Sequence, residues 1–304
     1  EELGDKSGIG RTLGNIGNIY SRQGNNEKAL EYYEKSLKID EELGDKSGMG
    51  RTLGNIGLIY RDQGNYEKAL EYFERDLKIK DDIGDKEGMG YSYNGIGTIY
   101  SQQGNNEKAL EYYEKSLKIG DKRMMIASYT NIGNIYYKQG NNEKALECYE
   151  KSLKISEEMG NKTSIGYNLC NIGIIYTDQG NNEKALEYQL KSLKIREEIG
   201  DKEGLGLSLS SIGTIYHAQG NNEKALEYYE KSLKIRVEIG NKIEMGDSYH
   251  NIGNIYVKQG NNEKALKYLL KSKKISEEIN VITGLDKTAK ALMEVYEKLG
   301  NNKK

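Results

Sequence analysis

The sequence predicts an all-α solenoid of seven helix-turn-helix repeats followed by a capping helix. The phrase GNNEKALEYYEKSLKI recurs unchanged from Gly24, Gly104 and Gly220, and close variants occur four more times. A second phrase, similar to NIGNIY, precedes every copy, and its tyrosine returns every 40 residues with one interval of 36. Self-similarity at such a period is typical of repeat architectures. The seven tyrosines are Tyr20, Tyr60, Tyr100, Tyr136, Tyr176, Tyr216 and Tyr256.

The segment that ends in each of these tyrosines is predicted to form one helix, called helix A. In the first repeat it is expected at about residues 7–23, because Leu13, Ile16 and Tyr20 recur at the spacing of one helical face. Gly24 then provides the left-handed residue that ends many helices. Glycines inside helix A weaken an isolated helix, so this helix needs close packing against its neighbours.

A second helix, called helix B, is predicted from the GNNEKAL phrase onward. Asn25 or Asn26 is expected to cap its first turn. Leu30, Tyr33 and Leu37 fall on one face, which is expected to pack against helix A.

The backbones of the two helices are expected to approach each other at Gly17 and Ala29. Gly44 is expected to end helix B, and Asp45 to cap the next helix A. One solenoid domain over residues 1–304 is therefore predicted. Its repeats span about 7–44, 45–84, 85–120, 121–160, 161–200, 201–240 and 241–280, and the capping helix spans about 285–299.

The 36-residue interval between Tyr100 and Tyr136 marks an irregular joint. Gly120 ends helix B about one turn early, which keeps the helical face in phase. The larger side chains at 123–126 can fill the space that the missing turn leaves. A local change in curvature is predicted over 115–130. This irregularity favours a natural array over a consensus-engineered one.

The two ends of the sequence also resemble parts of a repeat. Residues 1–6 match the tail of a helix B, and residues 300–302 match the turn that opens one. Ends of this kind can stack on other copies, and stacking that does not close produces filaments. A structural protein that assembles end to end is therefore the alternative to a binding protein.

Composition narrows the function. Apolar residues make up 36% and charged residues 30%, and the net charge is −2. This balance gives no electrostatic basis for binding nucleic acid or an anionic membrane, and no apolar run approaches the length of a membrane span. Cys148 and Cys170 form no metal or disulfide motif, which favours a reducing compartment such as the cytoplasm.

No residues stand out as a catalytic or cofactor site. The two histidines, His217 and His250, have no second ligand at metal spacing, and Cys170 is expected to be an inert thiol. No nucleophile–base set or phosphate loop rises above the repeated pattern. The sequence therefore predicts a protein that is not an enzyme and holds neither cofactor nor metal.

The repeated residues resemble the tetratricopeptide repeat family. Ile16, Gly17 and Tyr20 match its helix-A motif, and Ala29 and Tyr33 match its helix-B motif. The resemblance recurs in all seven repeats. The longer 40-residue form, with the Leu-Gly-Asn string of residues 13–15, is similar to repeats of cell-polarity adaptor scaffolds and of bacterial signalling proteins.

The resemblance implies a right-handed superhelix whose concave groove is lined by helix A and binds proteins or extended peptides. It implies no catalysis by the repeats. The sequence departs from the family in lacking proline after helix B. It also lacks a lysine at the position of Gly14, so a chaperone-tail ligand is not expected.

Comparison of the seven repeats separates two arcs of helix A. The positions of Ile16, Gly17 and Tyr20 are identical throughout, whereas those equivalent to Arg11 and Gly14 vary from repeat to repeat. The varied arc is expected to face outward and to form the groove. The alternative is that exposed positions drift without restraint, but exposed positions of helix B vary less.

The predicted groove changes character along the chain. Arginines dominate the first two repeats, tyrosines the middle, and histidines the last part, with amides throughout. Arginines can clamp carboxylates and amides can bond a peptide backbone, so an extended ligand with acidic residues over the first two repeats and apolar or aromatic residues over the middle is expected. The candidate residues are Arg11, Asn15, Asn18, Arg22, Arg51, Asn55, Arg61, Tyr91, Asn94, Asn131, Asn134, Tyr137, Tyr167, Asn171, His217, His250, Asn251 and Asn254.

Overall fold

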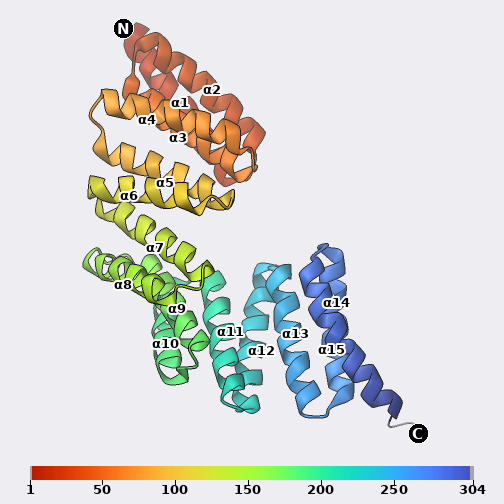
Figure 1. The fold of residues 1–304 in the computed structure, drawn as a ribbon. Helices are drawn as coiled ribbons and strands as arrows, with labels where there is room; N and C mark the ends of the chain where they lie inside the picture. Colours follow the sequence, from red (N-terminus) through yellow and green to blue (C-terminus); the bar gives the residue numbers. More distant parts are fainter. Residues whose placement is uncertain (1, 302–304) are drawn as a thin grey trace. The chain divides into compact units, whose positions relative to one another are not determined.

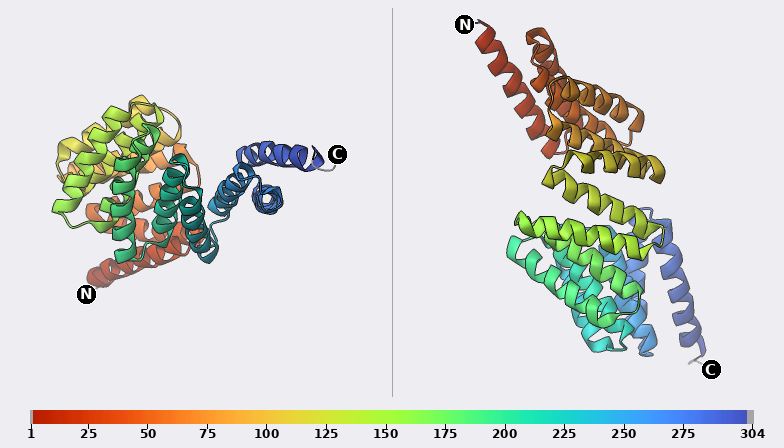
Figure 2. Two further views of the ribbon diagram at one scale, coloured as in Figure 1. Left: turned by 90° about the horizontal axis from the view of Figure 1, so that it is seen from below. Right: turned by 60° about the vertical axis from the view of Figure 1, so that its left-hand side comes forward.

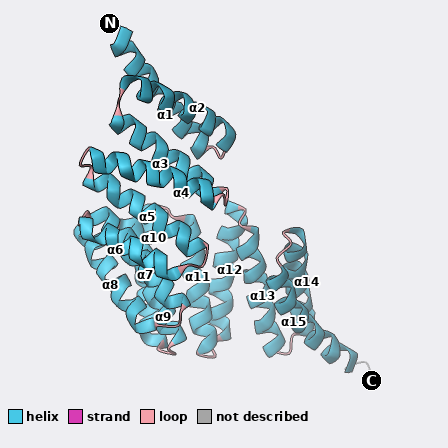
Figure 3. Cartoon of the chain, turned by 45° about the horizontal axis from the view of Figure 1, so that its top comes forward, coloured by secondary structure: helices cyan, strands magenta, loops and turns pink. Residues whose placement is uncertain are grey.

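The computed structural model describes residues 2–301, with all side chains in this range except those of residues 2–5, 282, 283 and 301. Throughout this range the regular elements are α-helices, and none is a strand (Figure 3). The helices are α1 (Glu2–Arg22), α2 (Asn26–Leu43), α3 (Lys46–Asp62), α4 (Tyr66–Asp82), α5 (Lys86–Gln102), α6 (Asn106–Ile119), α7 (Lys122–Lys138), α8 (Asn142–Glu158), α9 (Lys162–Asp178), α10 (Asn182–Ile199), α11 (Lys202–Ala218), α12 (Asn222–Ile239), α13 (Lys242–Lys258), α14 (Asn262–Glu278) and α15 (Ile282–Asn301). This order confirms seven helix pairs followed by one further helix.

The helix ends form as their residues predict. Asn25 caps α2, and its side-chain oxygen accepts a hydrogen bond from the Lys28 N–H at 3.2 Å. Gly44 ends α2 with a φ of 66°, a conformation that favours glycine. Asp45 then caps α3 by accepting a bond from the Gly48 N–H at 3.0 Å.

The chain divides into two compact bodies between Ile155 and Ser156. Within each body the helix pairs lie side by side (Figures 1 and 2). Helix B of one repeat contacts helix A of the next, as α2 contacts α3 and α4 contacts α5 in the N-terminal body. In the C-terminal body, α10 contacts α11 and α12 contacts α13 in the same way. Each face is thus covered by a neighbour, as expected for repeats that cannot bury a core alone.

In five repeats a glycine of helix A lies against an aromatic ring of helix B. A Cβ added to Gly17 would lie 2.6 Å from Cε1 of Tyr33. Gly17 thus lies against the Tyr33 ring, Ala29 is fully buried, and the expected approach of the two backbones at Gly17 and Ala29 stays a prediction. Helix A lacks a side chain at this position because the ring of helix B occupies the space.

Two further contacts recur between the helices of a repeat. Tyr20 stacks on Tyr32 with ring centroids 5.5 Å apart. The Ser36 hydroxyl donates to the Gly10 carbonyl of helix A at 2.8 Å. Equivalent serine bonds join the helices in five other repeats. The predicted packing arc of helix A is buried, as Ile56 at 1% exposed illustrates.

The structure corrects the expectation for the first residues. Residues 1–6 were expected to resemble the tail of a helix B, but α1 runs unbroken from Glu2 to Arg22. At the equivalent turn, Asp45 donates to the carbonyl of Asp40. Residues 42–48, which have the same sequence as residues 2–8, contain the break between α2 and α3, whereas residues 2–8 lie within one helix.

The final helix is also longer than expected. It continues through Gly300 to Asn301. These two residues are therefore helical and do not form the start of the turn expected at residues 300–302. Residue 302 lies outside the described range. Leu292 and Val295 pack into the core beside Val257 and Leu269. Met293, where a core glycine would stand, is 64% exposed. These contacts agree with a capping role.

The irregular joint forms as the sequence predicts. Helix α6 has 14 residues, four fewer than α2. Met124 packs against Gly90, at 3.3 Å from the position of an added Cβ. In the second repeat the equivalent glycine, Gly50, meets Asp76 and Lys80 of helix B instead. A side chain from the next helix A thus fills the space left by the missing turn, and the change in curvature stays a prediction.

The substitution Gly17→Ala should destabilise the N-terminal body by about 1–3 kcal/mol, because the added methyl group displaces the Tyr33 ring. The matched control is Gly8→Ala in the same helix, where nothing lies within 4 Å of an added Cβ. That change should stabilise the helix by up to about 1 kcal/mol. Urea unfolding followed by circular dichroism measures both, and equal midpoints for the two variants would contradict the packing model.

Candidate ligand pocket between α1, α3 and α5

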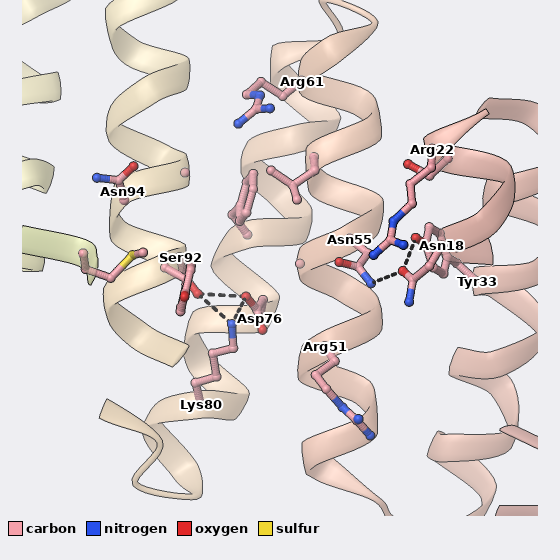
Figure 4. Close-up of a pocket in the computed structure, with 17 residues that line it drawn as sticks. Asn18, Arg22, Tyr33, Arg51, Asn55, Arg61, Asp76, Lys80, Ser92 and Asn94 are labelled. Atoms are coloured by element: carbon pink, nitrogen blue, oxygen red, sulfur yellow. Dashed lines mark hydrogen bonds and ion pairs between the residues drawn. The ribbon is translucent and has the colours of Figure 1, made fainter. Parts of the chain in front are cut away.

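A pocket of about 540 Å³ opens between the first three A helices of the N-terminal body (Figure 4). Helices α1, α3 and α5 form its rim, and side chains of α2 and α4 form its floor. We call it the α1–α3–α5 pocket. Its lining residues are Asn18, Ser21, Arg22, Tyr33, Arg51, Gly54, Asn55, Leu58, Arg61, Phe73, Asp76, Lys80, Tyr91, Ser92, Asn94, Gly95 and Met124.

Three arginines stand on the rim of this pocket. Arg61 pairs with its neighbour Asp62 at 2.7 Å. Arg22 and Arg51 are exposed, and neither forms an ion pair with a carboxylate of the described residues. Elsewhere in this body, Lys35 is paired with Glu31 one turn away. The pocket rim therefore carries two exposed cationic groups without a direct ion pair, of which Arg51 also interacts at longer range with the buried Asp40.

Two amides cross the pocket wall from α1 to α3. The Asn55 amide donates to the Asn18 side-chain oxygen at 3.1 Å, and the Tyr33 hydroxyl donates to the same oxygen at 2.7 Å. Part of the predicted amide ladder is thus used inside the protein. The amide nitrogen of Asn18 and the side-chain oxygen of Asn55 make no hydrogen bond within the described residues, so each can still bind a peptide backbone.

A buried ion pair lies on the pocket floor. Asp76 is fully buried, and its Oδ2 accepts bonds from Lys80 at 2.7 Å and from Ser92 at 2.8 Å. Its Oδ1 has no hydrogen-bond partner. Burial raises the pKa of Asp76, and the nearby Lys80 ammonium opposes that shift only in part. Because the two charges neutralise each other, the floor does not cancel the positive charge of the rim.

The pocket wall beside this pair is apolar. Leu58 is 38% exposed, whereas Phe73 is 4% exposed. Gly95 lies against Phe73, where an added Cβ would be 2.8 Å from the ring. The pocket thus combines an apolar wall with a cationic rim.

A smaller pocket of about 150 Å³ adjoins the first one toward α1. It contains Arg11 and Asn15 and shares Asn18, Arg51 and Asn55 with the larger pocket. The structure therefore brings together all nine candidate residues of the first three repeats, from Arg11 to Asn94.

A family model described as tetratricopeptide repeat matches this chain at five segments. The matches lie at residues 8–82, 48–122, 123–198, 162–238 and 204–278, and together they cover most of the chain. The chain belongs to the tetratricopeptide repeat family. No curated protein matches it in sequence.

Solved structures share the tetratricopeptide fold at low sequence identity. The chain is similar to a signal-transduction ATPase with a tetratricopeptide repeat sensor from Pyrococcus horikoshii, with 22% identity and a TM-score of 0.73, over 96% of this chain and 46% of that one. It is similar to the quorum sensor NprR from B. thuringiensis, with 18% identity and a TM-score of 0.71, over 86% of this chain and 75% of that one. For RapI the identity is 18% and the TM-score 0.69, over 89% of this chain and 98% of that one. The chain therefore spans less than half of the ATPase.

The remaining candidates of the N-terminal body lie on α7, away from the pocket. Asn131 donates to the Asn94 side chain at 3.5 Å. Asn134 accepts a bond from the Tyr149 hydroxyl at 2.7 Å. Tyr137 follows on the same helix. These side chains continue the row of polar groups but line no part of the α1–α3–α5 pocket.

The candidates of the C-terminal body are more dispersed. Tyr167 is 41% exposed on α9, whereas Asn171, Asn251 and Asn254 are half-buried. His250 shares a pocket of about 200 Å³ with residues of α13, α14 and α15. The structure thus gathers no single site from this group.

Both histidine side chains contact neighbouring polar side chains. His217 contacts Asn222 at 2.9 Å and Lys258 at 3.0 Å. His250 contacts Asn254 at 2.8 Å and Thr288 at 3.3 Å, and burial lowers its pKa. No group of three or more possible metal ligands occurs among the residues that were described.

Two further observations concern the thiols and the membrane. Cys170 is fully buried, and desolvation raises its pKa, so its thiolate is disfavoured. Within the described part of the chain, no helix is long and apolar enough to cross a bilayer.

Sequence reasoning missed the pocket residues that helix B supplies. Phe73, Asp76 and Lys80 lie on α4, whereas all the predicted groove residues belong to helix A. A comparison of repeats at this position could have found Asp76, because it stands where the other six repeats have serine. The signal was present, but only the structure shows that this position faces a pocket.

Replacing the floor pair by serines, Asp76→Ser with Lys80→Ser, should stabilise the N-terminal body by about 1 kcal/mol or more, because a buried ion pair seldom recovers its desolvation cost. The fourth repeat already has Ser152 and Ser156 at these positions. Burial raises the pKa of Asp76 in the folded state, so its ionised form costs stability near neutral pH, and this cost disappears as the pH falls through the folded pKa. The gain over wild type should therefore shrink toward pH 4. Urea unfolding at several pH values measures it, and a gain independent of pH would contradict the assignment.

Proposed function

We propose that this tetratricopeptide protein is a scaffold that binds an acidic segment of a protein or an extended peptide along its A helices. The observation that carries the proposal is the exposed pair Arg22 and Arg51, which flanks a pocket and forms no direct ion pair with a carboxylate of the described residues. Desolvated or bidentate arginine–carboxylate contacts are among the stronger polar interactions in proteins. The free amide groups of Asn18 and Asn55 lie between these arginines and can bond a peptide backbone.

The comparisons support a binding role of a general kind. The family is typically a non-catalytic interaction scaffold. Two structural neighbours are described as containing a sensor or as being a quorum sensor. On this basis the present chain would serve as the adaptor or sensor part of a larger protein. The free thiols Cys148 and Cys170 support a reducing compartment such as the cytoplasm.

Selection from a random twelve-residue peptide library should enrich aspartate and glutamate on the wild-type protein. The double variant Arg22→Ser/Arg51→Ser should lose this enrichment, and selected peptides should bind it about tenfold or more weakly, since one lost charged hydrogen bond is worth about 1.5–3 kcal/mol. Fluorescence anisotropy measures the affinities.

The matched control for charge is Lys38→Ser/Lys78→Ser. Both lysines are exposed on the B helices of the same body, so the net charge changes equally while the pocket is unchanged. This control should bind the selected peptides like wild type. Enrichment without acidic residues, or equal weakening by both double variants, would overturn the proposal of an acidic ligand.

Self-association is a second candidate function, favoured by exposed apolar side chains on α15. Met293 is 64% exposed and Tyr296 53% exposed. Light scattering coupled to size exclusion over a hundredfold concentration range should then show a mass that grows with concentration. Met293→Ser/Tyr296→Ser should abolish that growth. A constant monomer mass for the wild type would remove this candidate and leave the binding scaffold.

A further inference from the structure

The second repeat lacks the polar side-chain contact that joins the two helices in the first, third, fourth and sixth repeats. In the first repeat the Tyr33 hydroxyl bonds Asn18 at 2.7 Å, and in the fourth the Tyr149 hydroxyl bonds Asn134 at 2.7 Å. Tyrosine–threonine pairs replace them in the third and sixth repeats. The second repeat has Phe73 and Leu58 at these two positions. Neither side chain can donate or accept a hydrogen bond, so an apolar surface replaces the polar contact.

A glycine lies against the Phe73 ring at the same place. Gly95 stands at the position that is asparagine in five repeats. The Phe73 ring lies between Gly57 and Gly95, at 3.1 Å and 2.8 Å from the positions of their added Cβ atoms. An asparagine at residue 95 would therefore collide with the ring and occupy the pocket mouth. The Phe73 ring therefore fills the place of a side chain at residue 95 and forms the apolar wall of the pocket together with Leu58.

The resulting space fits a bulky side chain. Its volume of about 540 Å³ falls in the range of small-molecule sites, about 300–1,000 Å³. Tyr91 on the rim is 42% exposed and Leu58 on the wall is 38% exposed. An apolar residue that entered here would remove both from water. Burying one aromatic or aliphatic side chain contributes about 1.5–3 kcal/mol.

We propose that the α1–α3–α5 pocket is the anchor subsite of this protein: it takes one large apolar side chain, such as tryptophan or leucine, from a peptide whose flanking carboxylates bind Arg22 and Arg51. This proposal rests on the proposed binding of an acidic peptide and adds the residue that the peptide inserts. The charge of the occupant follows from the two exposed arginines without a direct ion pair, and its apolar core follows from the wall formed by Leu58 and Phe73. An isolated large side chain in a desolvated pocket is a common source of binding energy in interfaces.

Synthetic peptides with two glutamates on each side of a central residue test the proposal. The central residue is tryptophan, leucine or alanine, and binding is followed by fluorescence anisotropy and by calorimetry. The wild-type protein should bind the tryptophan and leucine peptides at least about tenfold more tightly than the alanine peptide, which corresponds to about 1.4 kcal/mol. A single-stranded thymidine twelve-mer in the same assay should bind more weakly than the tryptophan peptide.

The decisive variant is Leu58→Asn/Phe73→Tyr, which gives the second repeat the polar pair that the first and fourth repeats already contain. It should fold, which circular dichroism verifies, and the ratio of tryptophan to alanine affinity should fall to about threefold or less. Affinity for the alanine peptide should hardly change, because Arg22 and Arg51 are retained.

The matched control is Asn134→Leu/Tyr149→Phe, which makes the reverse change in the fourth repeat of the same body. This control should keep the wild-type ratio, because residues 134 and 149 do not line the pocket. A ratio lowered equally by both double variants would show a general loss of packing and would overturn the proposal.

The outcomes separate the anchor from the binding function. If the three peptides bind equally and Arg22→Ser/Arg51→Ser weakens all of them, the acidic-peptide function stands and the apolar anchor is wrong. If no peptide binds at millimolar concentration, both are wrong. If the oligonucleotide binds more tightly than every peptide, the occupant has been misassigned.

Discussion

The fold depends on one steric relation: helix A has a glycine where helix B inserts a large side chain, which is an aromatic ring in five repeats and Gln189 or Leu269 in the other two. A Cβ at Gly17 would lie 2.6 Å from the Tyr33 ring, and equivalent contacts join Gly97 with Tyr113 and Gly133 with Tyr149. Each such glycine lowers the stability of an isolated helix A. The array recovers this loss because the ring is buried only when the two helices pack together, so hairpin formation and core formation are one event.

The same repeated contacts explain why the α1–α3–α5 pocket forms beside the second repeat. Where tyrosine reaches asparagine and serine reaches the helix-A carbonyl, each repeat satisfies its own polar groups and leaves little space. The second repeat interrupts both contacts, with Phe73 in place of tyrosine and Asp76 in place of serine. The buried Asp76–Lys80 pair and the apolar wall are the two consequences of these changes, and they lie side by side in one pocket (Figure 4).

The predicted groove residues divide according to what the protein does with their polar groups. Asn18 and Asn134 accept tyrosine hydroxyls and so contribute to the packing of their repeats. His217 and His250 contact neighbouring side chains. Arg22 and Arg51 stand apart, since no carboxylate of the described chain pairs with them. Variation between repeats therefore identified positions near the surface, but the partners of each side chain decide which of them remain available to a ligand.

The sequence by itself determined the helices, their caps and the packing arc, because these depend on contacts within a few residues of one another. The spacing of Ile16 and Tyr20 and the turn at Gly44 needed no knowledge of the rest of the chain. Only the tertiary structure showed that α1 begins at Glu2, that Gly17 meets the Tyr33 ring and that the chain forms two bodies. It also decided the pocket, since that space lies between side chains of α1, α3, α4 and α5. Whether a charge is paired or a wall is exposed depends on atoms distant in sequence, and no periodicity encodes it.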